Sequence, residues 1–298
     1  KKKIKLHLSR DRFGEKPLYI LQKYNEIFFG SEIKQIFSLL NKKQDINYNK
    51  INDYLVYGYK SLFKKNNTFF KNIKRVEPDN LLKIDKKLNI SEKKYWKFAS
   101  YKKQNIKNFD TNLKTIKDSL FQSIEKRLLS DVPLCFSLSG GIDSNTLVAI
   151  AAKEFDIKPH TFSIINSDKR YNEEEMIDLS VKHLKIKNTK IKINNKNFIN
   201  NLTQLINYHD KPISTISFYL QSQLYKSVKK NNFKVIINGA AADEIFTGYY
   251  DHYLAYLYQV KKNKLLFKKE KNHWQKNVMP FIRNPYLKKH NYFIKDKN

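Results

Sequence analysis

Two adjacent glycines, with serines on both sides and an acid close by, form the strongest chemical signal in the chain. Residues 139–144 read Ser-Gly-Gly-Ile-Asp-Ser, follow the apolar run 133–138 and precede a helical pattern. Adjacent glycines let the backbone turn tightly and bring its N–H groups against a phosphate. Ser139 and Ser144 add hydroxyl donors, and a helix N-terminus favours an anion. Asp143 would repel phosphate unless a divalent cation lay between them, so we expect it to ligate Mg²⁺.

A second acidic segment repeats this pattern farther along the chain. The strand-like run 234–237 is followed by a glycine, and Asp243 and Glu244 then open the next helix. Asp243 could complete with Asp143 a two-carboxylate clamp on Mg²⁺-pyrophosphate, which places the two carboxylates within about 8 Å of each other. Glu244 is expected to orient a neighbour. The competing interpretation is that both acids only complement the helix dipole, and that the two glycines form an ordinary strand–turn–helix corner.

The elements that must position these residues show a regular alternation. Between about 131 and 250, apolar strand-like runs are each followed by an amphipathic helical pattern. The expected strands are 133–138, 160–165 and 234–237, and the expected helices start at Ser144, Asn172 and Asp243. This order predicts an α/β fold with a parallel sheet covered by helices on both faces.

The preceding sequence has a different texture. Residues 1–98 contain short alternating segments broken by turn residues, which predicts a β-rich region with strands at 17–21, 26–30 and 80–84. A short helix is expected at 31–40 with Ser31 as its cap. A polar linker at 99–110 leads into the second domain, 111–298. That domain opens with a helix near 111–129 whose apolar face is Leu113, Ile116, Leu120 and Ile124.

Composition excludes several classes of protein. No apolar run approaches the roughly 20 residues of a membrane helix. Cys135 is the single cysteine, which excludes an intrachain disulfide and a multi-cysteine metal site. A cytoplasmic protein is the simplest interpretation.

The formal net charge of +30 raises the question of a nucleic-acid partner. Its lysine clusters are scattered among asparagines and lack the aromatic interleaving of a single-strand binder. A compositional bias accounts better for the charge, so nucleic acid is not the expected partner.

The motifs resemble those of a known family. Residues 139–144 are similar to the SGGxDS loop of the PP-loop ATP pyrophosphatases. Residues 234–249 resemble the SGxGxDExFxGY segment of asparagine synthetases, with Thr161–Ile165 similar to that family's second strand. Residues 10–19, Arg-Asp-Arg-Phe-Gly-Glu-Lys-Pro-Leu-Tyr, resemble the RDRxGxKPLY signature of its glutaminase domain. The chain thus resembles the glutamine-hydrolysing asparagine synthetase family over most of its length.

This resemblance implies a fold, a reaction and a site. The fold would be PP-loop, adenine nucleotide α hydrolase-like, preceded by a partial β-rich glutaminase region of the Ntn type. ATP would adenylate a carboxylate, aspartate in the family, and ammonia derived from glutamine would form the amide with release of AMP and pyrophosphate. Catalytic roles fall to Asp143, Asp243 and Glu244, and Mg²⁺ to Asp143 and Asp243. The expected nucleotide contacts are Ser137, Ser139, Gly140, Gly141, Asp143, Ser144, Ile164, Asn238 and Gly239. No membrane partner is expected, and a homodimer is compatible with the resemblance.

The chain also departs from the family pattern. No cysteine precedes residue 10, and Cys135 lies within an expected strand, so the glutaminase half-reaction is expected to be absent. We interpret the sequence as a fragment that lacks the start of the glutaminase domain and the end of the synthetase domain. Ala240 and Ala241 replace an acid and a glycine of many relatives, and Lys211 replaces a glutamate. These changes leave open whether aspartate is the acceptor.

Two alternatives remain at this point. One is a PP-loop enzyme that modifies tRNA, which the charge favours and the glutaminase-like motifs do not. The other is an inactive truncated remnant.

Overall fold

The structure is a computed structural model that describes residues 5–97, 108–193 and 196–291. Its contacts divide the chain into two units, each of which contains two separate stretches of sequence. The first unit comprises 1–114 and 193–226, and the second comprises 115–192 and 227–298. Most of the expected linker, 99–110, lies outside the described residues.

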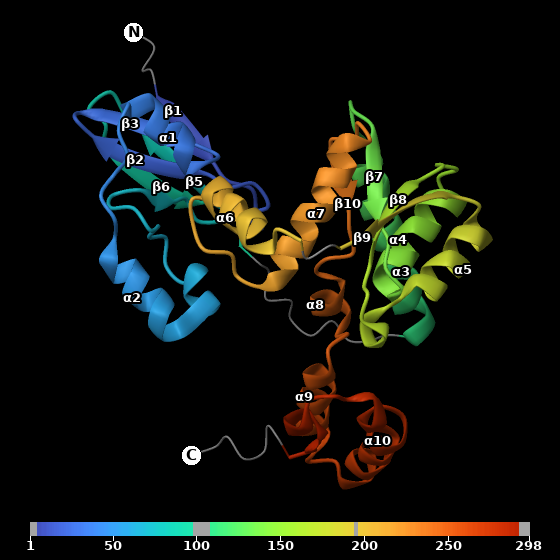
Figure 1. Ribbon diagram of the computed structural model, residues 1–298. Coiled ribbons are helices and arrows are strands. Elements are labelled where there is room, and N and C mark those ends of the chain that lie inside the picture. The colour runs from blue at the N-terminus through green and yellow to red at the C-terminus, as the bar shows by residue number, and fades with distance from the viewer. Residues whose placement is uncertain (1–4, 98–107, 194–195, 292–298) are drawn as a thin grey trace. The chain divides into compact units, whose positions relative to one another are not determined.

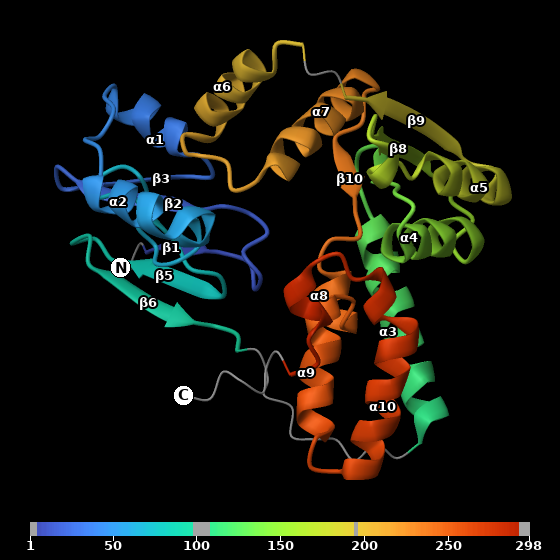
Figure 2. The ribbon, with the colours of Figure 1, turned by 60° about the horizontal axis from the view of Figure 1, so that its bottom comes forward.

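A four-stranded parallel sheet forms the centre of the second unit, in the order β10-β7-β8-β9 (Figures 1 and 2). The predicted α/β class with a parallel sheet is therefore confirmed. The strands are β7 (Leu134–Ser137), β8 (His160–Ile165), β9 (Lys187–Lys192) and β10 (Val235–Ile237).

Helices α4 (Ile142–Lys153) and α5 (Glu174–Leu184) pack together on this sheet. Their apolar residues meet those of β7 and β8, and burial of this surface supplies the main stabilising term for the unit. The buried cluster consists of Phe136, Leu138, Val148, Ala151, Ile165 and Ile177. The short turn η2 (Lys169–Tyr171) leads from β8 into α5.

Strand β9 was not among the expected elements. Its sequence, Lys-Asn-Thr-Lys-Ile-Lys, has little apolar content, yet all six of its residues pair with β8. β9 lies at the edge of the sheet, and its three lysines, Lys187, Lys190 and Lys192, are exposed and so are tolerated there. Hydrogen bonding to the neighbouring strand decides this element, and a hydrophobicity pattern does not contain that information.

The first unit contains two three-stranded antiparallel sheets, ordered β1-β5-β6 and β3-β2-β4. The expected strands at 26–30 and 80–84 are confirmed, and the one expected at 17–21 begins two residues later. The strands are β1 (Leu6–Ser9), β2 (Tyr19–Lys23), β3 (Glu26–Gly30), β4 (Lys74–Arg75), β5 (Asn80–Ile84) and β6 (Ile90–Lys94). Helix α2 (Tyr48–Tyr57) and the turn η1 (Gly58–Leu62) lie between β3 and β4 along the chain, which are two strands of the same sheet.

Helix α1 (Ile33–Leu40) corrects the expected cap. The residue before the helix is Glu32 and not Ser31, and its N–H donates to the Gln35 side chain at 3.1 Å. A glutamine at the third helical position thus satisfies the backbone N–H of the cap residue itself. The buried residues Ile33, Ile36 and Phe37 pack with Leu21 and Ile73.

Helix α6 (Phe198–His209) belongs to the first unit, although it lies far from α1 in the sequence. The Lys34 ammonium donates to the Tyr208 carbonyl, 174 positions later, at 3.0 Å. It also lies 3.9 Å from the centre of the Tyr208 ring. Helix α7 (Ile216–Lys230) follows, with residues up to 226 in the first unit and the last four in the second.

Helix α3 (Phe109–Leu128) forms where a helix was predicted, but its expected apolar face is only partly buried. Ile124 is buried, whereas Leu113 and Ile116 are 54% and 51% exposed. A helical period identifies residues that share a face, and what covers that face depends on the neighbouring elements.

The last part of the chain forms a small helical cluster within the second unit. Its buried residues are Leu254, Leu257, Trp274 and Ile282. The elements are α8 (Ala242–Phe246), α9 (Tyr250–Val260), α10 (Lys264–Asn277), η3 (Met279–Phe281) and η4 (Pro285–Lys288). Across the described residues, every helix is too short or too polar to cross a membrane.

Candidate nucleotide-binding site

The loop 138–141 joins the carboxyl end of β7 to the N-terminus of α4, and its own side chains hold it in shape. The Ser144 hydroxyl is buried and accepts from the Ser139 N–H at 3.0 Å. The Asn145 amide donates to the carbonyls of Ser139 and Gly141 at 2.9 and 2.8 Å. The Ser139 hydroxyl lies 2.9 Å from that of Ser144 and accepts from the Gly141 N–H at 3.2 Å. Both serines therefore fix the loop, in addition to any contact they make with a ligand.

Gly140 brings the loop against the start of α5. Its N–H donates to the Glu173 carboxylate at 2.9 Å. A Cβ at position 140 would lie 3.0 Å from the Cβ of Glu173 and 3.2 Å from that of Met176, so a side chain there would push α5 away. The same N–H that a phosphate oxygen would approach already binds an anionic oxygen, which shows that this donor points toward negative charge.

The segment after β10 lies against the same helix N-terminus. A Cβ at Gly239 would stand 3.0 Å from the Cβ of Asp143 and 3.1 Å from the backbone nitrogen of Ser144. Asn238 turns its side-chain oxygen to the N–H of Ala240, at 3.0 Å. Because β7 and β10 are parallel neighbours, the two loops meet at the carboxyl edge of the sheet, where open α/β sheets bind ligands.

Three acids converge at this edge. Burial raises the pKa of Asp143, and the carboxylates of Asp243 and Glu244 raise it further. The Tyr249 hydroxyl donates to Glu244 at 2.8 Å. This hydrogen bond is the main cause of the raised pKa of Tyr249, with smaller effects from burial and from all three acids. Position 248 is a glycine, since a Cβ there would collide with the Asp243 carboxylate.

This donor set fits Mg²⁺. The like charges of Asp143, Asp243 and Glu244 disfavour one another, and a divalent cation would relieve that repulsion. Carboxylate oxygens are the ligands that Mg²⁺ prefers. Among the described residues, no group of three or more acidic, histidine or cysteine side chains is arranged as a ready cage for a metal. A site with few protein ligands suits Mg²⁺, which keeps waters and substrate phosphates as its other ligands.

The remaining expected residues lie on neighbouring strands. Ser137 is the last residue of β7 and pairs with Phe162 of β8. Ile164 lies two residues farther along β8, and both Ser137 and Ile164 are half-buried. The structure thus places every expected site residue in the second unit, on adjacent strands, in the loops that follow them or in the first turn of α4 or α8.

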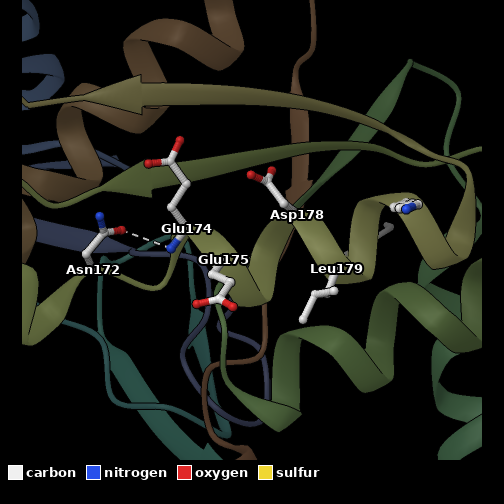
Figure 3. A pocket seen from close by; sticks show the side chains of 6 residues that line it. Asn172, Glu174, Glu175, Asp178 and Leu179 are labelled. Atoms are coloured by element: carbon white, nitrogen blue, oxygen red, sulfur yellow. Dashed lines mark hydrogen bonds between the residues drawn. The ribbon is translucent and has the colours of Figure 1, made fainter.

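A surface hollow of about 510 Å³ lies beside the loop, along α5 (Figure 3). Its lining includes Glu174, Glu175, Asp178 and Lys182, and none of residues 138–141. The Lys190 ammonium bridges Glu174 and Asp178 at 2.8 Å each. This hollow is therefore distinct from the nucleotide loop.

Sequence reasoning missed three contributors to the site. Asn145 follows the recognised motif directly, and its two bonds to the loop carbonyls had no sequence signal. Glu173 bonds to Gly140 across 33 residues, a contact that only the fold could bring about. Tyr249 was read as part of a motif, and its contact with Glu244 was not anticipated.

Comparison with known families decides the assignment. The asparagine synthase family pattern matches residues 115–293, which is more than half of the chain. The chain belongs to the asparagine synthase family. A glutamine amidotransferase domain pattern matches residues 1–96. The predicted family resemblance is confirmed over both regions.

Several curated relatives align with most of this chain. Asparagine synthetases (glutamine-hydrolysing) 1 and 3 of Bacillus subtilis are each 30% identical to it, over 82% of the chain and 37% and 41% of their own lengths. Amidase chyE of Penicillium rubens is 22% identical over 81% of the chain and 37% of its own length. The chain therefore spans less than half the length of each of these relatives.

Solved structures give a fainter likeness. The NH3-dependent NAD synthetase of Campylobacter jejuni matches with a TM-score of 0.30 and 17% identity, over 48% of this chain and 61% of that one. The glutamine-dependent NAD+ synthetase of Acinetobacter baumannii matches with a TM-score of 0.30 and 13% identity, over 77% and 51%. Likenesses this low add nothing to the functional assignment.

Replacing Ala241 by glycine should stabilise the protein. Ala241 has φ +74°, a left-handed conformation that is unfavourable for a residue with a Cβ. Glycine removes this strain and adds entropy to the unfolded chain, so we expect a net gain of about 0.5–1 kcal/mol in the free energy of unfolding. Denaturant unfolding measures it. The matched control is Ala240→Gly, which relieves no left-handed strain and should give no gain. Equal effects of the two changes would contradict the strain argument.

The raised pKa of Asp143 makes a pH-dependent prediction. The folded chain holds the Asp143 proton more tightly than the unfolded chain, so this contribution to stability is present below the ordinary value of 3.8 and is lost as pH rises. Without ATP and Mg²⁺, Asp143→Asn should therefore be more stable than wild type at pH 7. Because the side chain is largely solvated, we expect a gain below about 1 kcal/mol.

Thermal melts at pH 7 and pH 4 measure this difference, which should shrink at the lower pH. Asp131→Asn, at an exposed position ahead of β7, is the control and should show no such trend. A less stable Asp143→Asn variant at pH 7 would count against repulsion among the three acids.

Proposed function

We propose that this chain provides the ATP-binding and adenylating part of an amide-forming ligase. The observation that carries the proposal is the convergence of Asp143, Asp243 and Glu244 on a glycine loop that already binds a carboxylate at Gly140. Anion-binding N–H groups beside paired acids suit a metal–polyphosphate complex and few other ligands. Family membership supports the same chemistry.

In the proposed reaction, the backbone donors of residues 139–141 and the first turn of α4 hold the phosphates of ATP. Asp143 and Asp243 would hold Mg²⁺, which when bound neutralises charge on the pyrophosphate leaving group. A substrate carboxylate oxygen attacks the α-phosphorus, and the bond between that phosphorus and the oxygen leading to the β-phosphate breaks. The products of this step are an acyl-adenylate and pyrophosphate.

Amide formation completes the proposed reaction. The nitrogen of ammonia attacks the acyl carbon, the bond to the AMP oxygen breaks, and the nitrogen loses a proton to solvent or a nearby base. The fixed loop contributes by orientation, because its donors are placed before the substrate arrives. Glu244 holds the Tyr249 hydroxyl and so acts as a positioning residue at this edge.

Aspartate is the proposed acceptor, by likeness to the synthetases, and glutamine is the proposed ultimate source of ammonia. Ala240 bears on the acceptor, because its methyl group cannot act on a substrate carboxylate as the acid of many relatives could. A different carboxylate acceptor would be consistent with this change. Comparing aspartate with other carboxylates in ATP–pyrophosphate exchange would identify the acceptor.

Asp143→Asn should weaken ATP·Mg²⁺ binding or ATP–pyrophosphate exchange by roughly 10²-fold, equivalent to about 3 kcal/mol of metal and phosphate stabilisation. Calorimetry with ATP·Mg²⁺ and the exchange assay measure the two quantities. Asp131→Asn is the matched control for the loss of one negative charge. If the Asp143 variant matched wild type in both assays, this residue would have no place in the site.

We also propose that these 298 residues do not hydrolyse glutamine by themselves. Glutaminase chemistry of this family uses a cysteine nucleophile, and the single cysteine here, Cys135, is buried in β7. Burial raises the pKa of its thiol to about 11, so it is protonated at neutral pH and a poor nucleophile. Incubation with glutamine should release no glutamate above a Cys135→Ala control. Release that depends on Cys135 would overturn this proposal.

A further inference from the structure

Three cations, Arg10, Arg75 and Lys211, lie near one another in the first unit, where the end of α6 meets the antiparallel sheets. Lys34 fixes this junction through its bonds to the Tyr208 carbonyl and ring. The chain then continues through His209 and Asp210 to Lys211, which is half-buried. Lys34 itself is balanced, because it pairs with Glu32 at 3.0 Å.

Arg10 forms the floor of this group and is only 8% exposed. Its guanidinium donates to three backbone carbonyls, those of Lys16, Val76 and Gly14, at 2.8, 2.7 and 2.8 Å. Carbonyls satisfy its donors, and the carboxylates of Asp11 and Glu77 offset part of its positive charge. Arg10 is therefore a fixed, buried cation.

Arg75, on β4, is less well satisfied. Its Nη2 makes a long contact of 3.5 Å to the Phe63 carbonyl. Its Nε is buried and has no hydrogen-bond partner among the described residues. A buried guanidinium donor without an acceptor is costly, and buried polar groups in folded proteins are nearly always hydrogen-bonded, so this one calls for an acceptor.

Lys211 completes the group. Burial lowers the pKa of its ammonium, and Arg75 and Arg10, in that order, lower it further. The charged groups that act on it most are thus both cations, and no ion pair of Lys211 with a carboxylate occurs among the described residues. By the resemblance, many relatives have a glutamate at this position, which would supply a negative charge. In this chain the lysine adds a positive charge instead.

We propose that Arg75 and Lys211 bind a small oxyanion of the phosphate or carboxylate class, with Arg10 behind them contributing charge. The unpartnered Nε of Arg75 would donate to one oxygen and the Lys211 ammonium to another. The site lies in the first unit, whereas the nucleotide loop lies in the second. The ligand takes the place of the carboxylate that Lys211 has replaced.

Thermal unfolding of the full chain tests the site, with inorganic phosphate as the probe and chloride at equal ionic strength as reference. At saturating phosphate, wild type should melt about 3 °C higher than in chloride. Lys211→Glu should melt higher than wild type in chloride, because its carboxylate pairs with Arg75, and should lose the response to phosphate. Lys43→Glu makes the same charge change at an exposed position and should keep the wild-type response.

A second variant guards against misfolding. Lys211→Met keeps an apolar stem but removes the ammonium, so it should fold and lose the phosphate response. Replacing phosphate by glutamate identifies the source of the anion, since a larger shift with glutamate indicates a carboxylate ligand and a larger shift with phosphate a phosphate ligand. An equal response in phosphate and chloride for wild type would overturn the proposal. A phosphate response that persists in both Lys211 variants would also overturn it, because the anion would then bind elsewhere.

Discussion

The close approach of two loops to the N-terminus of α4 is the constraint on which the candidate site depends. Parallel pairing of β7 with β10 brings their carboxyl ends together, but the loops can touch only because position 239 has no side chain. Gly140 plays the same part toward α5. A methyl group at either place would separate the segments that carry the donors and the acids. The glycines are therefore required by distance as much as by backbone conformation.

This close approach creates an electrostatic conflict that the protein does not resolve internally. Asp143, Asp243 and Glu244 raise one another's energy, as the raised pKa of Asp143 indicates. In a chain with a net charge of +30, three acids at one edge of a sheet are an exception to the composition. Retaining such repulsion costs stability, and a bound cation with phosphates would offset that cost. The opposite imbalance occurs at Lys211, on which the cations Arg75 and Arg10 act.

Neighbouring side chains decide how much of the loop is available to a ligand. Ser144 and Asn145 bond to the loop itself, so its shape is set before any nucleotide binds. The Glu173 carboxylate occupies the N–H of Gly140 and would have to give way to a phosphate oxygen. A preformed loop lowers the entropy cost of binding. A ligand must displace the Glu173 carboxylate from the Gly140 N–H, which a strongly charged ligand can do.

The sequence by itself determined the α/β class, most strands and the identity of the loop. It could do so because apolar strands, glycine pairs and serines at fixed spacing are local features. It did not predict β9, whose lysines hide an edge strand, nor the exposure of Leu113 and Ile116 on α3. Pairing and coverage by distant segments decide both. Only the tertiary structure placed Gly239 on Asp143, joined Glu173 to Gly140 and assembled Arg10, Arg75 and Lys211, because these contacts join residues far apart in the chain.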